Sequence, residues 1–466
     1  MRGSSRGSLP DANDAGLLSP GQASLLTDQY ELAMASSYLK RAMNEPAVFE
    51  LFARHLPPHR RWLLAAGIGP ALALVREIAY GEDELEYLGS LGFDRVFLDY
   101  LARFRFSGDI DAIPEGTIVF ANEPLVRVTA PRIEAQLLET LLLNQINFQT
   151  MVATKAARIA LAAGGGLPAG ERIVDFSARR DHGTDAAMKA ARAAAIAGAS
   201  GTSNLAAAMR YGLTPVGTMA HSYVMSFEHE QDAFGAFMED FPGDAVMLVD
   251  TYDTVEGVRR AIAAANATGV TLAGVRLDSG DLLDLSRKTR ALLDDAGLRA
   301  ARITASGDLE ERRIAELVAA RAPIDSFAVG TDLGTSRDSP VVNGIYKLVA
   351  HCIDGRWRDV RKRSPDKATV PGAKQVFREY IEAEMRGDVI GRVDERLRGR
   401  PLLVPFVRGG RLVREETVAQ MRERARNELM ALPTGLLELE GSQDDQRYPV
   451  TYSRRCDSAL AVRHTE

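Results

Sequence analysis

The chain has 466 residues, of which 46% are hydrophobic and 26% charged, and its formal net charge is −6. This length allows two or three domains with a large core, and the composition is that of an ordinary soluble globular protein. The negative charge argues against a general nucleic-acid-binding surface, which needs a basic field.

Cysteine content and the N-terminal residues indicate the compartment. Cys352 and Cys456 are the only two cysteines, which is too few for a disulfide framework or a cysteine-based zinc site. Neither a signal-peptide core nor an apolar run long enough to cross a membrane is present. We therefore expect a cytoplasmic protein with no membrane partner, and a disordered tail over residues 1–22.

Residues 23–130 have the mixed pattern of an N-terminal α/β domain. A helix is predicted to begin at Asp28, a possible N-cap with Glu31 three residues later. Alternating and apolar runs then predict strands over 47–54 and 61–67, helices between 70 and 104, and short strands over 108–130. Two helices, over 132–146 and 148–163, are predicted to follow.

Repeated strand–helix units begin at Arg172 and continue to about residue 336. Each unit has a small or apolar run that ends in Gly, Ser, Thr, Asp or Arg, and such units imply a parallel sheet. Their number favours a closed (β/α) barrel over an open doubly wound sheet. The predicted fold class is α/β: an irregular (β/α) barrel over 131–345, with the N-terminal domain before it. Residues 346–466 are predicted to form a hairpin around Asp354 and a C-terminal region, with a helix near 416–430, that packs on the N-terminal domain.

Polar residues follow most of these predicted strands. Because active sites of such barrels lie at the carboxyl ends of the strands, we expect these side chains at one edge: Asp175, Ser203, His221, Asp253, Asp278, Asp308 and Asp332. His221 stands before a helix in "GTMAHS", where it is either a packed turn residue or a group presented to a ligand.

The segment "VRLDSGD" places Arg276, Asp278, Ser279 and Asp281 at a strand end. The carboxylates could bind sugar hydroxyls or Mg²⁺ through water, and Arg276 offers a planar fork of donors to an anion. The alternative is an Asp N-cap with an ion pair.

Two later strand ends carry glycine. "SGD" contains Gly307 and "VGTDLG" contains Gly330 and Thr331. Small residues let backbone N–H groups approach a phosphate, although the same residues also form ordinary turns. In "DFSARRDHG", Phe176 and Arg179 offer an aromatic face and a guanidinium to a flat anionic ligand, unless Phe176 is a core residue.

Six segments occur in the order found in nicotinate phosphoribosyltransferases, and the resemblance spans about residues 25 to 345: "TDQYELAM", "FELFARHLPP", "DFSARRDHGTDAAMKAARAAAIAGASGTSNL", "GTMAHSYVMSF", "VRLDSGD" and "FAVGTDLGTS". The resemblance implies an enzyme that converts nicotinate, 5-phosphoribosyl 1-diphosphate, ATP and water to nicotinate mononucleotide, diphosphate, ADP and phosphate. The implied reaction passes through a phosphohistidine, uses Mg²⁺ and serves NAD salvage.

The resemblance also implies roles for single residues. His221 is the implied phosphoacceptor, and Tyr30 from the partner subunit of a homodimer is the implied second face of the nicotinate site. The remaining implied contacts are Phe176, Arg179, Ser203, Thr218 and Arg276 for nicotinate, Asp278, Ser279, Gly307, Gly330 and Thr331 for the phosphoribosyl donor, and Asp278 with Asp281 for Mg²⁺.

Three alternatives are weighed against this interpretation. A nicotinamide-using relative carries an Asp where this chain has Ser203, and a carboxylate there would repel nicotinate. A quinolinate-using relative lacks the His221 motif. A non-catalytic phosphosugar-binding barrel would not need both His221 and Tyr30.

Overall fold

The computed structural model describes residues 22–461, apart from 167, 363, 365–366 and 440–447. The expected tail therefore lies outside the described residues, except for Gln22, which begins a 3-10 helix, η1 (Gln22–Leu25). Among the described residues, no helix is long and apolar enough to span a membrane.

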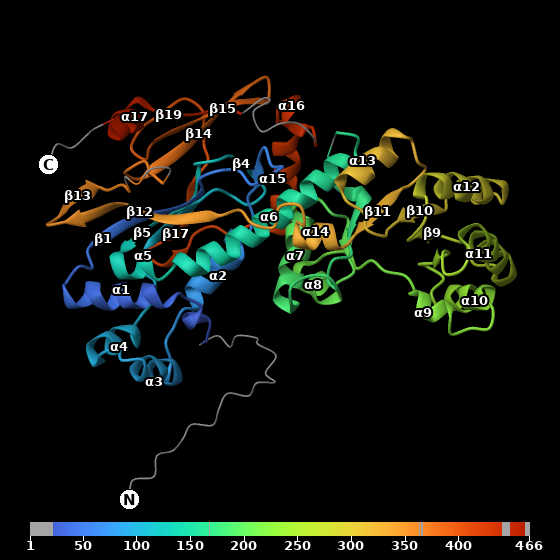
Figure 1. Ribbon diagram of the computed structural model, residues 1–466, viewed down its shortest axis with the longest axis horizontal. Helices are drawn as coiled ribbons and strands as arrows, with labels where there is room; N and C mark the ends of the chain where they lie inside the picture. The colour runs from blue at the N-terminus through green and yellow to red at the C-terminus, as the bar shows by residue number, and fades with distance from the viewer. Residues whose placement is uncertain (1–21, 167, 363, 365–366, 440–447, 462–466) are drawn as a thin grey trace, which may run out of the picture.

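An antiparallel sheet forms one end of the molecule (Figure 1). Its order is β13 (Arg356–Asp359), β12 (Gly344–Ile353), β1 (Pro46–Ala53), β5 (Pro124–Pro131), β3 (Asp109–Ala112), β17 (Val404–Arg408) and β18 (Arg411–Leu412). β17 pairs with β3 and β12 pairs with β1, so late segments of the chain complete a sheet that early segments begin. The hairpin predicted around Asp354 is confirmed by the β12–β13 pairing.

Short helices and small sheets surround this antiparallel sheet. The helices are α1 (Gln29–Lys40), α2 (Ile68–Glu77), α3 (Glu82–Ser90), α4 (Arg95–Leu101) and α5 (Arg132–Gln136). β2 (Leu63–Leu64) pairs with β4 (Ile118–Val119), and a further sheet has the order β16 (Arg400–Pro401), β14 (Lys374–Ile381), β15 (Glu384–Arg392), β19 (Val450–Tyr452). α15 (Val418–Met430), α16 (Thr434–Leu437) and α17 (Arg454–Ala461) belong to the C-terminal region, where α15 confirms the predicted helix.

A parallel sheet forms the second part of the molecule. Its order is β7 (Gly201–Thr202), β6 (Ile173–Asp175), β11 (Ser326–Val329), β10 (Arg302–Ala305), β9 (Gly274–Leu277) and β8 (Val246–Leu248). The helices between the strands are α7 (Thr184–Ile196), α8 (Leu205–Tyr211), α9 (His221–Val224), α10 (Glu230–Asp240), α11 (Thr254–Thr268), α12 (Leu282–Asp295) and α13 (Glu311–Ala319), and α14 (Thr331–Thr335) follows the last strand.

Within the described residues the parallel sheet is open and does not close into a barrel. Each strand pairs with its neighbours in this order, but the two edge strands, β7 and β8, do not pair with each other. The extended segment around Pro215, between α8 and α9, makes a single isolated bridge among the described residues, to Thr202 of β7. Proline has no N–H to donate and Gly217 adds no side chain for packing, so a ladder does not extend there. The closed barrel expected from the repeated units is thus replaced by an open half-barrel.

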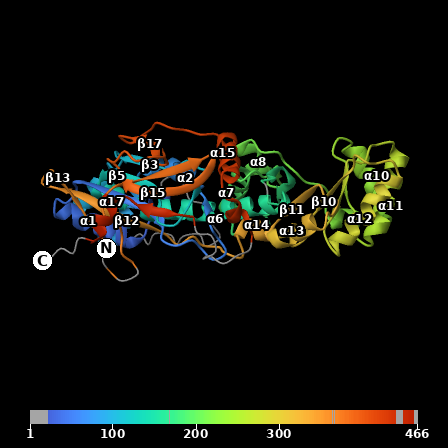
Figure 2. The same ribbon diagram turned by 90° about the horizontal axis from the view of Figure 1, so that it is seen from above.

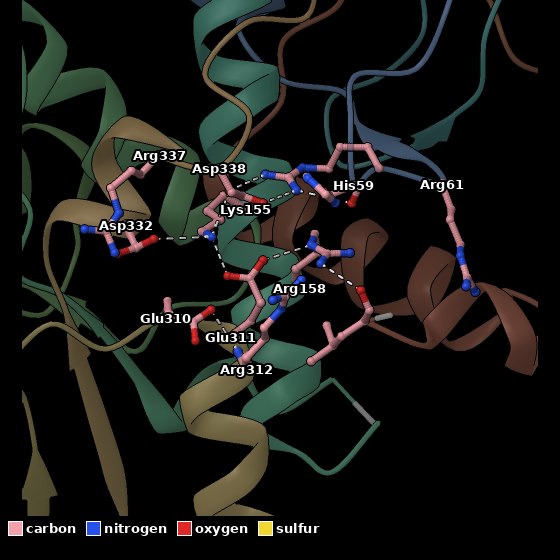
Figure 3. Close-up of a pocket in the computed structure, with 12 residues that line it drawn as sticks. His59, Arg61, Lys155, Arg158, Glu310, Glu311, Arg312, Asp332, Arg337 and Asp338 are labelled. Carbon is pink, nitrogen blue, oxygen red and sulfur yellow. Dashed lines mark hydrogen bonds and ion pairs between the residues drawn. The ribbon is translucent and has the colours of Figure 1, made fainter. Parts of the chain in front are cut away.

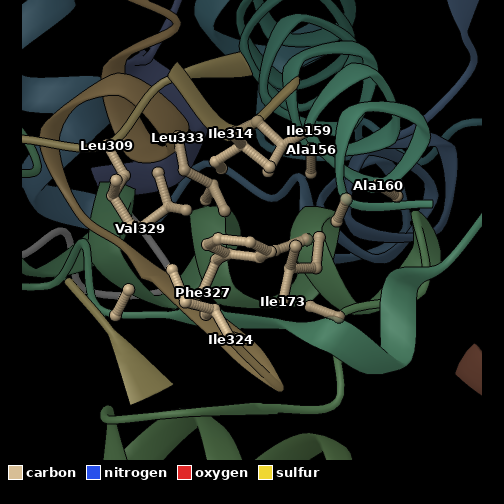
Figure 4. Close-up of a cluster of buried hydrophobic side chains, with 14 of the residues drawn as sticks. Ala156, Ile159, Ala160, Ile173, Leu309, Ile314, Ile324, Phe327, Val329 and Leu333 are labelled. Atoms are coloured by element: carbon tan, nitrogen blue, oxygen red, sulfur yellow. The ribbon is translucent and has the colours of Figure 1, made fainter. Parts of the chain in front are cut away.

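One long helix joins the two parts. α6 (Glu139–Ala163) is continuous, so the helix break predicted near residue 147 is wrong and the break lies between α5 and α6 instead. No Pro or Gly interrupts residues 139–163, and the apolar side chains of α6 are buried against both cores. Figure 4 shows Ala156, Ile159 and Ala160 of α6 packed near Phe327 and Ile173 of the parallel sheet.

Candidate active site at the carboxyl ends of the parallel strands

The centre of the candidate site is a hydrogen-bonded group from β9 and β10. Arg276, the third residue of β9, donates from Nε to Ser306 Oγ at 2.8 Å and from a terminal nitrogen to Asp278 Oδ1 at 2.7 Å. Ser306 also donates to Asp278 Oδ1. The parallel register places Ala305 beside Leu277, and this brings the two strand ends together.

These contacts hold Asp278 in its charged form. Burial opposes ionisation, but the Ser306 hydrogen bond and the charge and hydrogen bond of Arg276 outweigh it and lower the pKa of Asp278. His221 adds a smaller effect in the same direction. Asp278 is therefore a carboxylate acceptor over the physiological pH range.

His221 begins α9 and faces this carboxylate. Its Nε2 lies 3.8 Å from Asp278 Oδ2, and its Nδ1 lies 3.2 Å from Thr251 Oγ1. If Nδ1 donates to Thr251, Nε2 keeps its lone pair. The side chain is 40% exposed, so the ring is accessible to a ligand.

A second carboxylate, Asp250, lies beside Asp278 at the end of β8. Its Oδ2 accepts from the Asp278 backbone N–H at 3.1 Å and from Ser279 Oγ at 2.6 Å. Its buried Oδ1 has no hydrogen-bond partner among the described residues. No group of three or more His, Cys, Asp or Glu in the described part of the chain could hold a metal ion alone, but Mg²⁺ is commonly held by one or two carboxylates together with substrate phosphates. Asp250 and Asp278 fit that donor set.

Phe176 lies next to the Arg276 guanidinium. The guanidinium carbon of Arg276 is 5.1 Å from the centre of the Phe176 ring. The two groups together offer a flat anionic ligand an aromatic face and a forked cation at one place. The structure thus brings Phe176 and Arg276 side by side.

A buried polar network supports the turn after Phe176. Asp175 accepts from Ser177 Oγ at 2.6 Å and from Thr202 Oγ1 at 2.7 Å. Ser177 Oγ also lies 3.0 Å from Asp181 Oδ2, and one hydroxyl proton cannot serve both carboxylates. Burial raises the pKa of Asp181 to about 6, a rise to which the charge of Asp175 adds, so a protonated Asp181 donates to Ser177 below that pH. Asp175, predicted at the open edge, is instead 1% exposed and supports the turn.

The glycine turns lie at the ends of β10 and β11. Gly307 has φ +84°, and a Cβ there would come within 1.8 Å of the Asp278 carbonyl oxygen. A Cβ added to Gly330 would lie 3.3 Å from the Phe176 carbonyl oxygen. Thr331, the next residue, begins α14. Both turns therefore adjoin residues of the strand-end group.

Four predicted site residues have other placements in the single chain. Asp281 accepts from the Leu283 and Asp284 backbone N–H groups as the N-cap of α12, which is the alternative considered for it. Thr218 donates its hydroxyl to the Val246 carbonyl, and Arg179 is exposed. Tyr30 lies on α1, at the opposite end of the molecule from α9 (Figures 1 and 2).

Sequence reasoning missed Asp250, Thr251 and the hydroxyl role of Ser306. Asp253 was expected at the edge, but it caps α11 by accepting from the Glu256 backbone N–H. The signal for Asp250 was its place directly after the apolar run "AVMLV", because the first polar residue after a buried strand stands closest to the sheet edge.

Comparisons with known proteins show to which family the chain is similar. A model described as the nicotinate phosphoribosyltransferase (NAPRTase) N-terminal domain matches residues 25–147, and one described as the nicotinate phosphoribosyltransferase (NAPRTase) family matches residues 172–385. Nicotinate phosphoribosyltransferase pncB2 of Mycobacterium tuberculosis is 48% identical over 448 residues, which cover 95% of this chain and 94% of that protein. Nicotinate phosphoribosyltransferase of Bacillus subtilis is 42% identical, with 82% of this chain and 79% of that protein covered.

A solved structure has the same fold. The crystal structure of human nicotinic acid phosphoribosyltransferase matches with a TM-score of 0.80 and 26% identity, over 94% of this chain and 99% of that chain. The chain belongs to the nicotinate phosphoribosyltransferase family and is an enzyme of NAD salvage from nicotinate.

Proposed function

We propose that this enzyme couples the formation of nicotinate mononucleotide to ATP hydrolysis through phosphorylation of His221. The observation that carries the proposal is the placement of the His221 ring, with Nδ1 at 3.2 Å from Thr251 and Nε2 facing Asp278. A neutral ring nitrogen is a competent nucleophile once its other nitrogen is held by a hydrogen bond.

In the phosphorylation step the Nε2 lone pair attacks the γ-phosphorus of ATP. A P–N bond forms, the bond to the bridging oxygen breaks, and ADP leaves with the electron pair. Water later cleaves the P–N bond and releases phosphate, so His221 is regenerated. Asp278, whose pKa is lowered by Ser306 and Arg276 against the effect of burial, is the charged group beside this ring.

In the transfer step nicotinate displaces diphosphate from the anomeric carbon of the phosphoribosyl donor. We place nicotinate at Phe176 and Arg276, with Arg179 near its carboxylate, and the ribose hydroxyls at Asp278 and Ser279. The turns at Gly307, Gly330 and Thr331 are proposed to bind the 5-phosphate with backbone N–H groups.

Mg²⁺ would be held by Asp278 and Asp250 rather than by Asp281, whose carboxylate caps its own helix. When bound, it would offset the negative charge of the leaving diphosphate. Thr218 is proposed to position the segment before His221, because its hydroxyl is donated to the backbone of Val246.

Substrate choice is proposed to depend on Ser203. Its backbone N–H donates to the Asp175 carbonyl at 2.9 Å, so the residue is held at the end of β7 near the turn that carries Phe176. A carboxylate at this position would repel the nicotinate anion, whereas the serine does not.

The His221 proposal is tested with the His221→Ala variant. We expect loss of ATP hydrolysis and of acid-labile phosphate incorporation from γ-labelled ATP, while slow transfer without ATP persists because it needs only substrate positioning. The His182→Ala variant is the matched control and should incorporate label as the unchanged enzyme does. Label retained at the full level in His221→Ala would disprove the phosphohistidine.

We further propose a homodimer in which Tyr30 of one subunit completes the site of the other. Support comes from the position of Tyr30, which is 48% exposed and lies on α1, at the opposite end of the molecule from α10 and α11 (Figure 2). Mixing inactive Tyr30→Ala with inactive Asp278→Ala subunits should restore activity, because a mixed dimer has one intact site. Absence of recovery despite demonstrated subunit exchange would disprove sharing.

A further inference from the structure

Tyr30, the residue proposed to complete the site of a second subunit, lies in the first turn of α1. Its side chain is 48% exposed, so the ring is accessible to another chain. Helix ends fray, and an exposed ring in a first turn keeps one position only if other contacts hold that turn. The contacts of the first turn of α1 therefore bear on the proposed shared site.

One residue of α6, Thr140, binds the acidic side chains on both sides of Tyr30. The Thr140 hydroxyl donates to Asp28 Oδ2 at 2.8 Å and is also hydrogen-bonded to Glu31 Oε1. The Thr140 backbone N–H donates to the same Glu31 oxygen at 3.1 Å. Thr140 thus links the start of α6 to the chain before and after Tyr30.

The two carboxylates are committed to these contacts. Asp28 is the N-cap of α1, yet its side chain makes no capping hydrogen bond to its own helix, although Asp at this position usually does. Glu31 is 0% exposed, and its Oε2 accepts from the Thr27 hydroxyl at 2.9 Å. Because a buried carboxylate without donors is costly, the donors of Thr140 determine where this turn is held.

The residue before Thr140, Glu139, contacts the Tyr30 hydroxyl. Burial raises the pKa of Tyr30, and the charges of Glu139, Glu31 and Asp28 and a hydrogen bond to Glu139 add to this rise. Glu139 is itself held by the side-chain amide of Gln136 at 3.0 Å. The start of α6 therefore contacts both the flanking acidic residues and the hydroxyl of Tyr30.

The other end of α6 is fixed to the part of the molecule that contains the parallel sheet. Figure 3 shows Lys155 and Arg158 of α6 directed toward Glu311 of α13 and Asp338, which follows α14. Lys155 Nζ lies 2.9 Å from Asp338 Oδ1, and Arg158 Nε lies 3.0 Å from Glu311 Oε1. One continuous helix thus relates the Tyr30 segment to the parallel sheet of its own subunit.

We propose that Thr140 is a positioning residue for the transfer reaction: its hydroxyl holds the first turn of α1 so that Tyr30 presents its ring to nicotinate in the site of the second subunit. This inference rests on the proposed sharing of Tyr30, and Thr140 itself touches no substrate. In a two-fold dimer, the place of a lent side chain in the partner's site follows from its place in its own subunit. A ring that is already held in position binds a ligand without a further cost of ordering.

The test uses mixed dimers that contain a single intact site. One subunit carries Asp278→Ala and lends Tyr30, and the other carries Tyr30→Ala and supplies the working strand-end group, so that only mixed dimers are active. Thr140→Val, which removes the hydroxyl and keeps the shape of the side chain, is placed in one subunit or the other. In the lending subunit we expect it to raise the KM for nicotinate by about threefold to tenfold, as for one lost hydrogen bond. In the other subunit it should leave the KM unchanged, because the Tyr30 ring of that subunit is already absent.

Two further variants in the lending subunit serve as controls. Thr140→Ser keeps the hydroxyl and should restore the KM, and Thr434→Val, at the exposed first residue of α16, should not change it. A KM that is the same for both placements of Thr140→Val, whether raised or not, overturns the role of Thr140 and leaves the shared site intact. Absence of activity in every mixture, including the one with Thr140 unchanged, overturns the shared site and this inference with it.

Discussion

The Asp278 carboxylate is held ionised by donors from two neighbouring strands. Ser306 at the end of β10 and Arg276 in β9 both bond to its Oδ1, which leaves Oδ2 facing His221. Oδ1 is thus held by hydrogen bonds within the protein, while Oδ2 is directed toward the His221 ring.

Removal of Arg276 tests how much this group contributes to anion binding. We expect Arg276→Ala to raise the KM for nicotinate by an amount that corresponds to about 1.5–3 kcal/mol, because a charged, forked contact is lost. Arg302→Ala, at the exposed start of β10, is the control and should leave the KM unchanged. An unaltered KM in Arg276→Ala with intact circular dichroism would contradict the assignment.

The raised pKa of the Asp181 carboxyl predicts how the stability of the protein depends on pH. Its pKa is raised to about 6, against about 3.9 in an unfolded chain. Between these values the folded protein binds a proton that the unfolded protein releases, so stability falls as pH rises across this window and then levels off above pH about 6.

The Asp181→Asn variant should flatten this dependence. The amide keeps a donor toward Ser177 and does not titrate, so we expect a smaller decrease in melting temperature between pH 5 and pH 7 than in the unchanged enzyme. Asp185→Asn, whose side chain is 69% exposed on α7, serves as the control. Parallel curves for Asp181→Asn and the unchanged enzyme would show that Asp181 does not carry the effect.

At the scale of elements, two glycines at strand and helix ends share a backbone conformation but have different surroundings. Gly307 has φ +84° and Gly297 has φ +77°, yet nothing lies within 4 Å of a Cβ at Gly297, whereas a Cβ at Gly307 would meet the Asp278 carbonyl at 1.8 Å. Substitution of Gly297 would therefore cause backbone strain alone, whereas substitution of Gly307 would also displace Asp278 of the candidate site.

Alanine at each glycine is expected to give different results. Gly297→Ala should lower the free energy of unfolding by about 1–2 kcal/mol through the left-handed backbone alone, with kcat/KM unchanged. Gly307→Ala should also lower kcat/KM, because the added methyl group forces Asp278 to move. Urea unfolding and steady-state kinetics measure the two effects, and equal kinetics in both variants would contradict this account of the turn.

At the scale of the whole molecule, Arg378 connects the C-terminal region to the first part of the chain. Its 0% exposed side chain bonds to Asp388 of β15 and Glu428 of α15 at 2.7 Å, and it lies 3.9 Å from Glu123, between β4 and β5. Burial and the charge of Asp388 raise the pKa of Glu123, so of these two carboxyl groups Glu123 is the one that binds a proton more readily. The single cation is thus shared by carboxylates from segments far apart in the chain.

Loss of this cation should destabilise the whole protein. We expect Arg378→Ala to lower the free energy of unfolding by about 3–5 kcal/mol, because buried carboxylates are left unpaired. Arg400→Ala removes a contact to the same Glu428 from a side chain that is 49% exposed, and should cost at most about 1 kcal/mol. Similar losses in the two variants, measured by urea unfolding, would be inconsistent with this role for Arg378.

Much of the candidate site was predictable from the sequence alone. Arg276, Asp278 and Gly307 were expected together because they follow apolar runs, and the carboxyl ends of parallel strands lie at one edge whatever the details of packing. The family motifs, and the order in which they occur along the chain, likewise indicated the activity. Both inferences rest on local patterns that the chain carries in every conformation.

Other features were decided only by the tertiary structure. The half-barrel remains open because the segment around Pro215 makes one bridge to Thr202 instead of a ladder, and periodicity does not report which strands pair. Asp250 joins Asp278 only through the register of β8 and β9. Arg378 is buried only because residues from 123 to 428 converge on it. Such contacts depend on chain segments far apart in sequence, whose approach is determined by packing of the whole molecule and not by any local pattern.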